Sequence, residues 1–352
     1  MRSRHVFTAV DTHTEGMAAR VVTSGVGVLP GATMLERAAW LVANRDDLRT
    51  LLMYEPRGHS AMSGSILQPP ADPRADVGVV FIEVSGCLPM CGHGAIGTVV
   101  AVLETGMVEA VEPTTVVRLD TPAGLVEAEA SVSDGAVVSV RLRNVDSFLL
   151  QRDAKVELAG AGAGSGALAG SGAGSGAAAL ELDVAYGGNF YAILPAARLG
   201  LDVVPSAHHD LVAAGLRVMN AVNAQLELAH PLEPAIAGCR HVILTGPSPH
   251  PGAVRSTVVI HPGWLDRSPC GTGTSALMAA LHARGELGIG EPFVHESIIG
   301  SRFVGELIGE TMVGDLPGVV PTVTGRAWVT GLNQYVLDPT DPFPAGFLLS
   351  GP

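Results

Sequence analysis

Hydrophobic and polar positions along this chain lay out the same elements twice. A run of β-branched and apolar residues, Val77-Gly-Val-Val-Phe-Ile-Glu-Val84, predicts a strand, and Ser256-Thr-Val-Val-Ile-His261 predicts a second one. Each run is followed, after a short glycine-containing segment, by an apolar stretch typical of a helix, at residues 95–105 and 274–284. The pattern therefore predicts two halves of similar design.

A short motif precedes each predicted helix. It reads Pro89-Met-Cys-Gly-His-Gly94 in the first half and Pro269-Cys-Gly-Thr-Gly273 in the second. In each half a further glycine, Gly106 or Gly285, follows the cysteine by fifteen residues, where a helix is expected to end. Chance similarity is the alternative in a chain with 44 glycines, but the matched spacing and context favour an internal repeat.

Strand-rich segments follow both helices, at residues 116–143 and 293–329, with Asp-Gly, Leu-Pro-Gly and Thr-Gly turn signals. The predicted fold class is α/β, with two pseudo-symmetric domains. Each domain is expected to be a curved, mostly antiparallel sheet or barrel around one central helix. We expect the domains to cover residues 1–148 and 149–331, with the cysteine of each motif at the N-terminal end of its helix.

Composition narrows the function. Of the 352 residues, 34 are acidic and 21 basic, and the resulting net charge of −13 argues against nucleic-acid or anionic-membrane partners. Lys155 is the only lysine, which disfavours Schiff-base chemistry. No apolar run reaches the length of a membrane span and the first residues lack a signal-peptide core, so we expect a cytoplasmic protein with free thiols. Residues 159–179 are Gly/Ala/Ser-rich, and we expect a loop without function there.

The two cysteines predict a specific chemistry. A helix N-terminus presents unpaired N–H groups and a partial positive charge, so Cys91 and Cys270 are expected to be biased toward thiolate. The backbone N–H groups of Gly92, His93, Gly271 and Thr272 are expected to bind a substrate carboxylate. Two such sites fit inversion at a carbon next to a carboxylate, in which one thiolate removes the α-proton and the other thiol returns one. This reaction requires no metal and no cofactor.

Five segments together resemble the proline racemase and hydroxyproline epimerase family. They are Asp11-Thr-His-Thr-Glu-Gly16, Met90-Cys-Gly-His-Gly94, Gly187-Gly-Asn-Phe190, Asp266-Arg-Ser-Pro-Cys-Gly-Thr-Gly-Thr-Ser275 and Gly300-Ser-Arg-Phe303. The resemblance implies a diaminopimelate-epimerase-like fold with the active site between two domains, and Cys91 and Cys270 as the two acid/base groups. It also implies that the last strand, within about residues 332–349, returns to the first domain.

The resemblance also bears on the substrate. Ser63 and His241 correspond to pocket positions of the family, and together they fit a ring hydroxyl, whereas Asp266 corresponds to a contact with the ring nitrogen. We therefore expect a 4-hydroxyproline 2-epimerase, with proline racemase as the alternative. The resemblance also implies that a trans-3-hydroxyproline dehydratase is less favoured, because such members of the family typically carry threonine at the position of Cys270. The expected partner is the small-molecule substrate, and the sequence leaves a homodimer open.

Three other interpretations remain open at the level of sequence. Cys91-x-His93 and Cys239-x-His241 each place soft metal ligands two residues apart, but structural zinc sites usually use Cys-x2–4-Cys spacing. A redox pair of Cys87 and Cys91 would leave the second motif unexplained. A binding protein for amino acids would keep the carboxylate site without the chemistry. Asp266 has the further alternative of capping the turn before Cys270.

Overall fold

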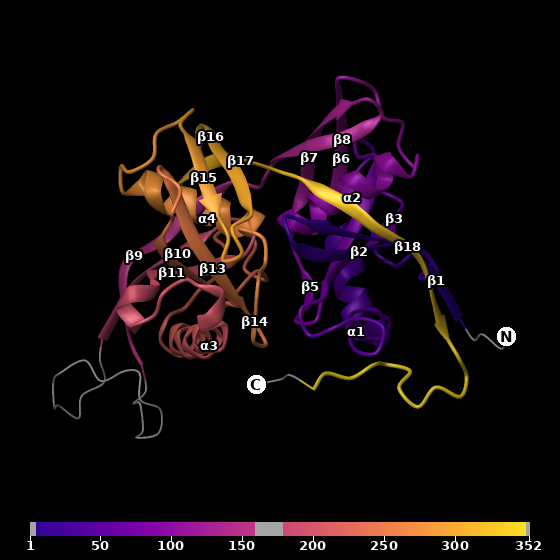
Figure 1. Ribbon diagram of the computed structural model, residues 1–352, viewed down its shortest axis with the longest axis horizontal. Helices are drawn as coiled ribbons and strands as arrows, with labels where there is room; N and C mark the ends of the chain where they lie inside the picture. Colours follow the sequence, from indigo (N-terminus) through magenta and orange to yellow (C-terminus); the bar gives the residue numbers. More distant parts are fainter. Residues whose placement is uncertain (1–4, 159–178, 350–352) are drawn as a thin grey trace. The chain divides into compact units, whose positions relative to one another are not determined.

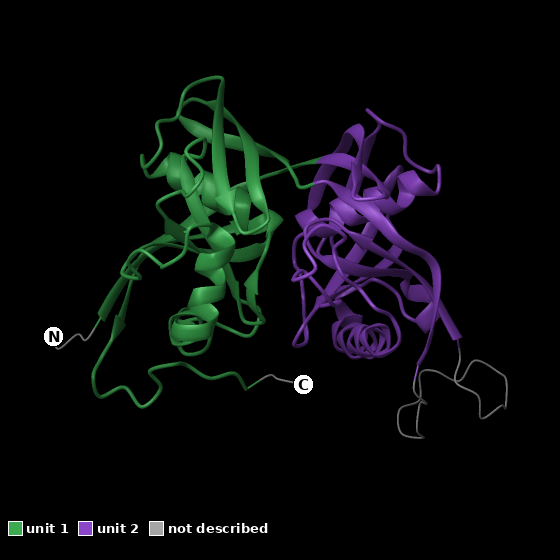
Figure 2. Ribbon diagram, turned by 180° about the vertical axis from the view of Figure 1, so that it is seen from behind, with its two compact units in different colours: residues 1–145, 322–352 green, residues 146–321 purple. Residues whose placement is uncertain are grey.

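The computed structural model describes residues 5–158 and 179–349 and contains two compact units (Figures 1 and 2). Unit 1 is formed by residues 1–145 and 322–352, and unit 2 by residues 146–321. The chain returns to unit 1 at Thr322, ten residues before the expected position, because Thr322–Gly325 pair with Val140–Arg143. Of the low-complexity stretch 159–179, all but Ala179 lies outside the described residues.

Unit 1 combines two helices with strands from both ends of the chain. Its elements are β1 (His5–Thr14), β2 (Met17–Ser24), α1 (Met34–Met53), β3 (Ser63–Gln68), β4 (Val77–Glu83), β5 (Gly86–Leu88), α2 (Gly92–Glu104), β6 (Thr114–Thr121), β7 (Gly124–Ser133), β8 (Ala136–Arg143) and β18 (Ala327–Leu337). β18 pairs antiparallel with β1 from Leu337–His5 to Ala327–Thr14, so the returning strand begins five residues before the expected range of about 332–349.

Unit 2 repeats this arrangement. Its elements are β9 (Ser147–Glu157), β10 (Ala179–Tyr186), β11 (Phe190–Pro195), the 3-10 turns η1 (Ala196–Leu199) and η2 (Pro205–Ala207), α3 (His208–Gln225), β12 (His241–Pro247), β13 (Ala253–Ile260), β14 (Trp264–Leu265), α4 (Gly271–Ala283), β15 (Pro292–Glu296), β16 (Arg302–Val313) and β17 (Leu316–Gly325). β17 begins in unit 2 and ends in unit 1.

In each unit the strands curve around one buried helix (Figure 1). Every residue of α2 from Gly92 to Leu103 is buried, and α2 packs against β1, β2, β3, β7, β8 and β18. α4 is buried from Gly271 to Ala280 and packs against β9, β10, β11 and β16. A helix that is apolar on all sides is stable only inside such a core. Of the second helices, α1 packs mainly against β4 and α3 mainly against β12.

The strand pairings show that the two units share one topology. β2–β3 and β11–β12 are parallel pairs, β3–β4 and β12–β13 are antiparallel pairs, and β4–β6 and β13–β15 are parallel pairs. In both units a hairpin is followed by a helix, α1 or α3. Three strands come next, and the central helix, α2 or α4, follows them. The predicted fold class, two pseudo-symmetric halves built around central helices, is confirmed.

Two local predictions need correction. The helices begin at Gly92 and Gly271, three residues earlier than predicted, because the glycine-containing motifs form the first helical turn. Leu316-Pro-Gly318 is not a turn but the start of β17, where Gly318 pairs with Phe148. The predicted helix ends are confirmed, since Gly106 and Gly285 have left-handed φ values of 72° and 74°. No described helix is both long and apolar enough to cross a membrane.

Candidate active site

Cys91 and Cys270 occupy the same place in the two units, as the N-cap residues of α2 and α4. The carbonyl oxygen of Cys91 accepts from the N–H of Ala95 at 2.8 Å, and that of Cys270 accepts from Thr274 at 2.7 Å. Both thiols are therefore held beside the first, unpaired N–H groups of a helix, as predicted. Their backbones differ, because Cys91 is extended with φ −140°, whereas Cys270 has a left-handed φ of 68°.

The second glycine of each motif has a steric role. A Cβ atom at Gly94 would lie 3.0 Å from the Sγ of Cys91, and one at Gly273 would lie 3.1 Å from the Sγ of Cys270. Real Cβ atoms rarely come so close to another heavy atom. The Cys-Gly-x-Gly motif therefore leaves each sulfur atom room against its own helix, and it does so to the same extent in both units.

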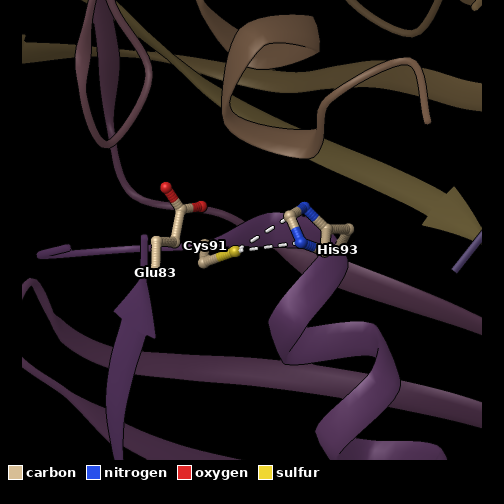
Figure 3. Close-up of side chains that lie close together, drawn as sticks. All are labelled: Glu83, Cys91 and His93. Atoms are coloured by element: carbon tan, nitrogen blue, oxygen red, sulfur yellow. Dashed lines mark hydrogen bonds between the residues drawn. The ribbon is translucent and has the colours of Figure 1, made fainter. Parts of the chain in front are cut away.

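In unit 1, Cys91 lies against an imidazole and a carboxylate (Figure 3). Both ring nitrogens of His93 are 3.6 Å from the Sγ of Cys91, and the ligand atoms of Glu83, Cys91 and His93 lie within 4.8 Å of one another. Glu83 is 2% exposed, and its Oε1 accepts from the hydroxyl of Ser63 at 3.2 Å. The predicted residues Ser63, Cys91, Gly92 and His93 are thus brought together around a buried carboxylate.

In unit 2, hydroxyl groups surround the thiol. The Tyr191 hydroxyl is 3.3 Å from the Sγ of Cys270 and 2.6 Å from the Oγ1 of Thr272. Asp266 is 1% exposed, and its Oδ1 accepts from both the N–H and the hydroxyl of Ser268 at 2.8 Å. Ser268 in turn accepts from the N–H of Cys270 at 3.2 Å. One oxygen of Asp266 therefore fixes the turn before Cys270, as the alternative interpretation of this residue predicted.

Electrostatics at Cys270 differ from the prediction. Burial and the negative charge of Asp266 raise the pKa of the Cys270 thiol to about 12, although hydrogen bonds from Tyr191, Gly273 and Thr272 act in the opposite direction. The expected bias toward thiolate is therefore wrong for this cysteine, because burial and the charge of Asp266 outweigh these hydrogen bonds. Cys270 is a neutral thiol, which suits a proton donor.

His241 lies beside the same cluster. It is the first residue of β12, pairs with Tyr191 across the parallel β11–β12 ladder, and its ring centroid is 4.9 Å from that of Tyr191. Burial lowers the pKa of His241 to about 3, so the ring is neutral. Its buried Nδ1 has no hydrogen-bond partner within the described part of the chain. A buried polar atom in this condition favours a ligand that supplies the partner.

Ser63 and His241 correspond to each other in the two repeats. Ser63 begins β3 and pairs with Ala19 of β2, in the same way that His241 begins β12 and pairs with Tyr191 of β11. They belong to different units, Ser63 with Cys91 and His241 with Cys270. Both predicted specificity positions are thus placed at the start of the equivalent strand in each unit.

Two site residues were missed by sequence reasoning. Glu83 ends β4 and is placed by its register opposite Ser63, and Tyr191 is the second residue of β11. The available signals were a carboxylate ending an otherwise apolar strand and a tyrosine shortly after the Gly187-Gly-Asn-Phe190 motif. Neither signal is specific enough to distinguish a site residue from an ordinary core residue.

The other cysteines have structural surroundings. None of the four, all of which are described, forms a disulfide. Burial raises the pKa of Cys87 to about 12 and that of Cys239 to about 11. The Cys239 thiol donates to the carbonyl oxygen of His241 at 3.1 Å. Among residues 5–158 and 179–349, the structure brings together one set of possible metal ligands, which are Glu83, Cys91 and His93.

Comparison with known proteins places the chain in a family. Residues 9–348 match the family model described as proline racemase. The chain is 58% identical over 349 residues to a 4-hydroxyproline 2-epimerase of Streptosporangium roseum, covering 99% of this chain and 100% of that protein. It is 41% identical over 342 residues to a proline racemase of Clostridioides difficile, covering 97% of each. The crystal structure of a hydroxyproline epimerase from Agrobacterium vitis with bound trans-4-hydroxy-L-proline matches with a TM-score of 0.90 at 38% identity, covering 99% of this chain and 97% of that one.

The chain therefore belongs to the proline racemase family. Its relatives are named racemases and epimerases, so it is an isomerase, and the predicted family and enzyme class are confirmed.

Proposed function

We propose that this protein is a 4-hydroxyproline 2-epimerase, which converts trans-4-hydroxy-L-proline into cis-4-hydroxy-D-proline by inverting C2. The observation that carries the proposal is the pair of thiols that cap two equivalent buried helices, each with a glycine leaving room for the sulfur. The relatives named 4-hydroxyproline 2-epimerase, one of them 58% identical, support the choice of substrate.

The proposed reaction uses one thiolate and one thiol on a single substrate molecule. The thiolate removes the α-proton and breaks the Cα–H bond, and the electron pair spreads into the substrate carboxylate. The opposing thiol then donates its proton to the other face of the same carbon. Each turnover moves one proton onto the first sulfur and takes one from the second, so the enzyme must exchange protons before it repeats the same direction.

The surroundings of the thiols suit these roles. The N–H groups at the starts of α2 and α4, including those of Gly92, His93, Gly271 and Thr272, stabilise the developing charge on the carboxylate. Cys270, whose pKa is raised to about 12, begins as the proton donor. Cys91, with the His93 imidazole 3.6 Å from its sulfur, begins as the base. The second oxygen of Asp266 binds the ring nitrogen of the substrate.

Contacts with the 4-hydroxyl group determine the preference of the enzyme for 4-hydroxyproline over proline. His241 is neutral and its buried Nδ1 has no partner among the described residues, so it can bind a hydroxyl group. Ser63 donates to Glu83 and keeps its lone pairs for a hydroxyl donor. Plain proline would leave the Nδ1 of His241 unpaired, which disfavours it.

Proline racemase is the alternative, favoured by the 41% identical relative of that name. Polarimetry with trans-4-hydroxy-L-proline, L-proline, D-proline and trans-3-hydroxy-L-proline tests the substrate directly. We expect the largest kcat/KM for the first. A larger value for proline would establish the alternative, and loss of optical activity through elimination from the 3-hydroxy compound would indicate a dehydratase.

Substitution of the thiols tests the mechanism. Cys91→Ser and Cys270→Ser should each lower epimerisation by at least about a hundredfold, because each removes one acid/base group. Iodoacetamide should inactivate the wild type, and pyrrole-2-carboxylate, a planar analogue of the carbanionic substrate, should protect it. Near-normal turnover of either serine variant would reject the two-base mechanism. A non-catalytic binding protein would exchange no α-proton in D2O.

A further inference from the structure

A buried series of hydrogen bonds leads from Ser256 through His295 and Thr274 to the backbone of Cys270. The Oγ of Ser256 on β13 lies 2.7 Å from the Nε2 of His295 on β15, and the Nδ1 of His295 lies 2.8 Å from the Oγ1 of Thr274. Thr274 then bonds to the carbonyl oxygen of Cys270 at 2.8 Å. Ser256, Thr274 and His295 are all at most 1% exposed.

The hydrogen bond to the carbonyl oxygen of Cys270 fixes the direction of the bond before it. A carbonyl oxygen can only accept, so the Thr274 hydroxyl must donate to Cys270. Thr274 therefore accepts from the N–H at Nδ1 of His295. Burial lowers the pKa of His295 to about 3, so the imidazole is neutral with its proton on Nδ1, and the bare Nε2 accepts from the Ser256 hydroxyl.

The hydrogen bonds meet at the strained residue of the site. Cys270 has φ 68° and ψ 107°, a conformation that is unfavourable for a residue with a side chain. Thr274 binds its carbonyl oxygen twice, through its N–H at 2.7 Å and through its hydroxyl at 2.8 Å. In unit 1 the corresponding residue is Ala95, which has only the N–H, and Cys91 has an ordinary extended φ of −140°. The additional support is thus present where the backbone is strained.

We propose that His295 is a positioning residue for Cys270, which acts through Thr274 to hold the Cys270 peptide in its left-handed conformation and its thiol in line with the substrate. The inference rests on the proposed function of Cys270 as an acid/base group. His295 does not contact the sulfur or the substrate, and its effect is to restrict the backbone that carries them. Small displacements of a reacting group are sufficient to slow a proton transfer strongly.

The test replaces one buried threonine hydroxyl by a methyl group in each unit and compares the effects on activity. Thr274→Val removes the hydroxyl that binds Cys270 at nearly constant volume, and Thr274→Ser keeps it. Thr98→Val is the matched control, because Thr98 lies in α2 and its hydroxyl bonds at 2.8 Å to Ser65, not to the cysteine carbonyl. We expect Thr274→Val to lower kcat by about tenfold or more with a smaller change in KM, and Thr274→Ser and Thr98→Val to stay within about threefold of the wild type.

A second measurement separates positioning from general loss of structure. Alkylation by iodoacetamide, followed by peptide mass spectrometry, gives the rate at Cys270 relative to the rate at Cys91 in the same molecule. We expect this ratio to change at least about threefold in Thr274→Val and in the same direction in His295→Gln, but not in Thr98→Val. If Thr274→Val does not fold, Ser256→Ala at the far end of the chain must change the ratio in the direction seen for His295→Gln.

The outcomes distinguish this inference from the function on which it rests. An unchanged kcat and alkylation ratio in Thr274→Val would overturn the positioning role of His295, while inactivity of Cys270→Ser would still support the two-base mechanism. Full activity of Cys270→Ser would overturn the proposed function itself.

Discussion

The Tyr191 hydroxyl is the group that most directly adjusts the chemistry of Cys270. It lies 3.3 Å from the sulfur, and its hydrogen bond lowers the pKa of a thiol that burial raises. Tyr191→Phe should therefore raise the pKa of Cys270 further and slow its alkylation at any given pH below that pKa. The loss of one hydrogen bond to a developing thiolate predicts a fall in kcat of about tenfold. Rates of epimerisation and of Cys270 alkylation between pH 7 and 10 would measure both effects.

Tyr186 provides the control for this substitution. It is a buried tyrosine in the same unit, on β10, and it packs against Phe148 and His230. Tyr186→Phe should leave the pH dependence of Cys270 alkylation unchanged. Equal profiles for Tyr191→Phe and the wild type would show that the Tyr191 hydroxyl does not act on the thiol.

The glycines behind the sulfur atoms make a second prediction at the scale of single residues. Gly94→Ala and Gly273→Ala should each lower kcat by at least about tenfold, since the new methyl group would lie 3.0 or 3.1 Å from Sγ and displace it. Alanine ordinarily stabilises a helix relative to glycine, so the loss of activity should exceed any loss of stability. Steady-state kinetics together with thermal unfolding would separate the two quantities.

Gly97→Ala is the matching variant without contact to the sulfur. Its Cβ would lie 2.7 Å from the Oγ1 of Thr12, so it should lower the melting temperature while preserving kcat per folded molecule. If Gly94→Ala behaves in the same way as Gly97→Ala, the steric role of the motif glycine is wrong.

Some residues of this site owe their role to a local sequence motif, and others owe it to residues far away in the sequence. Cys91, Gly92 and His93 form one local motif, and its chemistry follows from its position before a helix, so it could be predicted. Glu83 acquires its role from the β3–β4 register, which places it opposite Ser63, and register is not readable from either strand alone. The same holds for Tyr191, which its strand sets next to His241. The raised pKa of Cys270 depends on three-dimensional burial and was missed for that reason.

At the scale of elements, the central helices were predictable because both are apolar throughout and end at a left-handed glycine. α1 and α3 were not predicted, since they lack an equally apolar stretch. Leu316-Pro-Gly318 has turn composition but lies in a strand. Local composition is thus a weaker guide than a long periodic or apolar run.

The β9–β10 pair makes a prediction about the low-complexity segment. Glu157 pairs with Ala179 at the end of this antiparallel ladder, and Glu157 is also held by Gln225 at 2.9 Å through its backbone N–H and its carbonyl oxygen. The two strand ends are therefore close enough for a short turn. Replacing residues 159–178 with a turn of about four residues containing Asn-Gly should leave kcat and KM within about twofold of the wild type. A large rise in KM would show that the segment contributes to substrate binding.

At the scale of the whole molecule, one topology carries two different chemical environments. Both units place a thiol at the start of a buried helix, but Cys91 has an imidazole and a carboxylate beside it, whereas Cys270 has hydroxyl groups. Duplication of a fold explains the common geometry, and divergence at equivalent positions, such as Ala19 and Tyr191, explains the difference. In the proposed reaction this difference assigns Cys270, whose pKa is raised, as the first proton donor and leaves the role of base to Cys91.

The buried histidines also determine how the stability of the molecule responds to acid. Burial lowers the pKa of His241 and of His295 to about 3, below the value of about 6.5 expected in the unfolded chain. Between these values the unfolded chain holds a proton that the folded chain does not, so the free energy of unfolding falls as the pH falls from 6.5 toward 3. Each histidine contributes about 1.4 kcal/mol per pH unit within this window.

His241→Asn should therefore reduce the pH dependence of the urea midpoint between pH 6 and pH 4.5, whereas His209→Asn, at an exposed position, should not. Identical slopes for His241→Asn and the wild type would show that His241 is protonated in the folded protein, and would remove the neutral imidazole from the proposed recognition of the hydroxyl group.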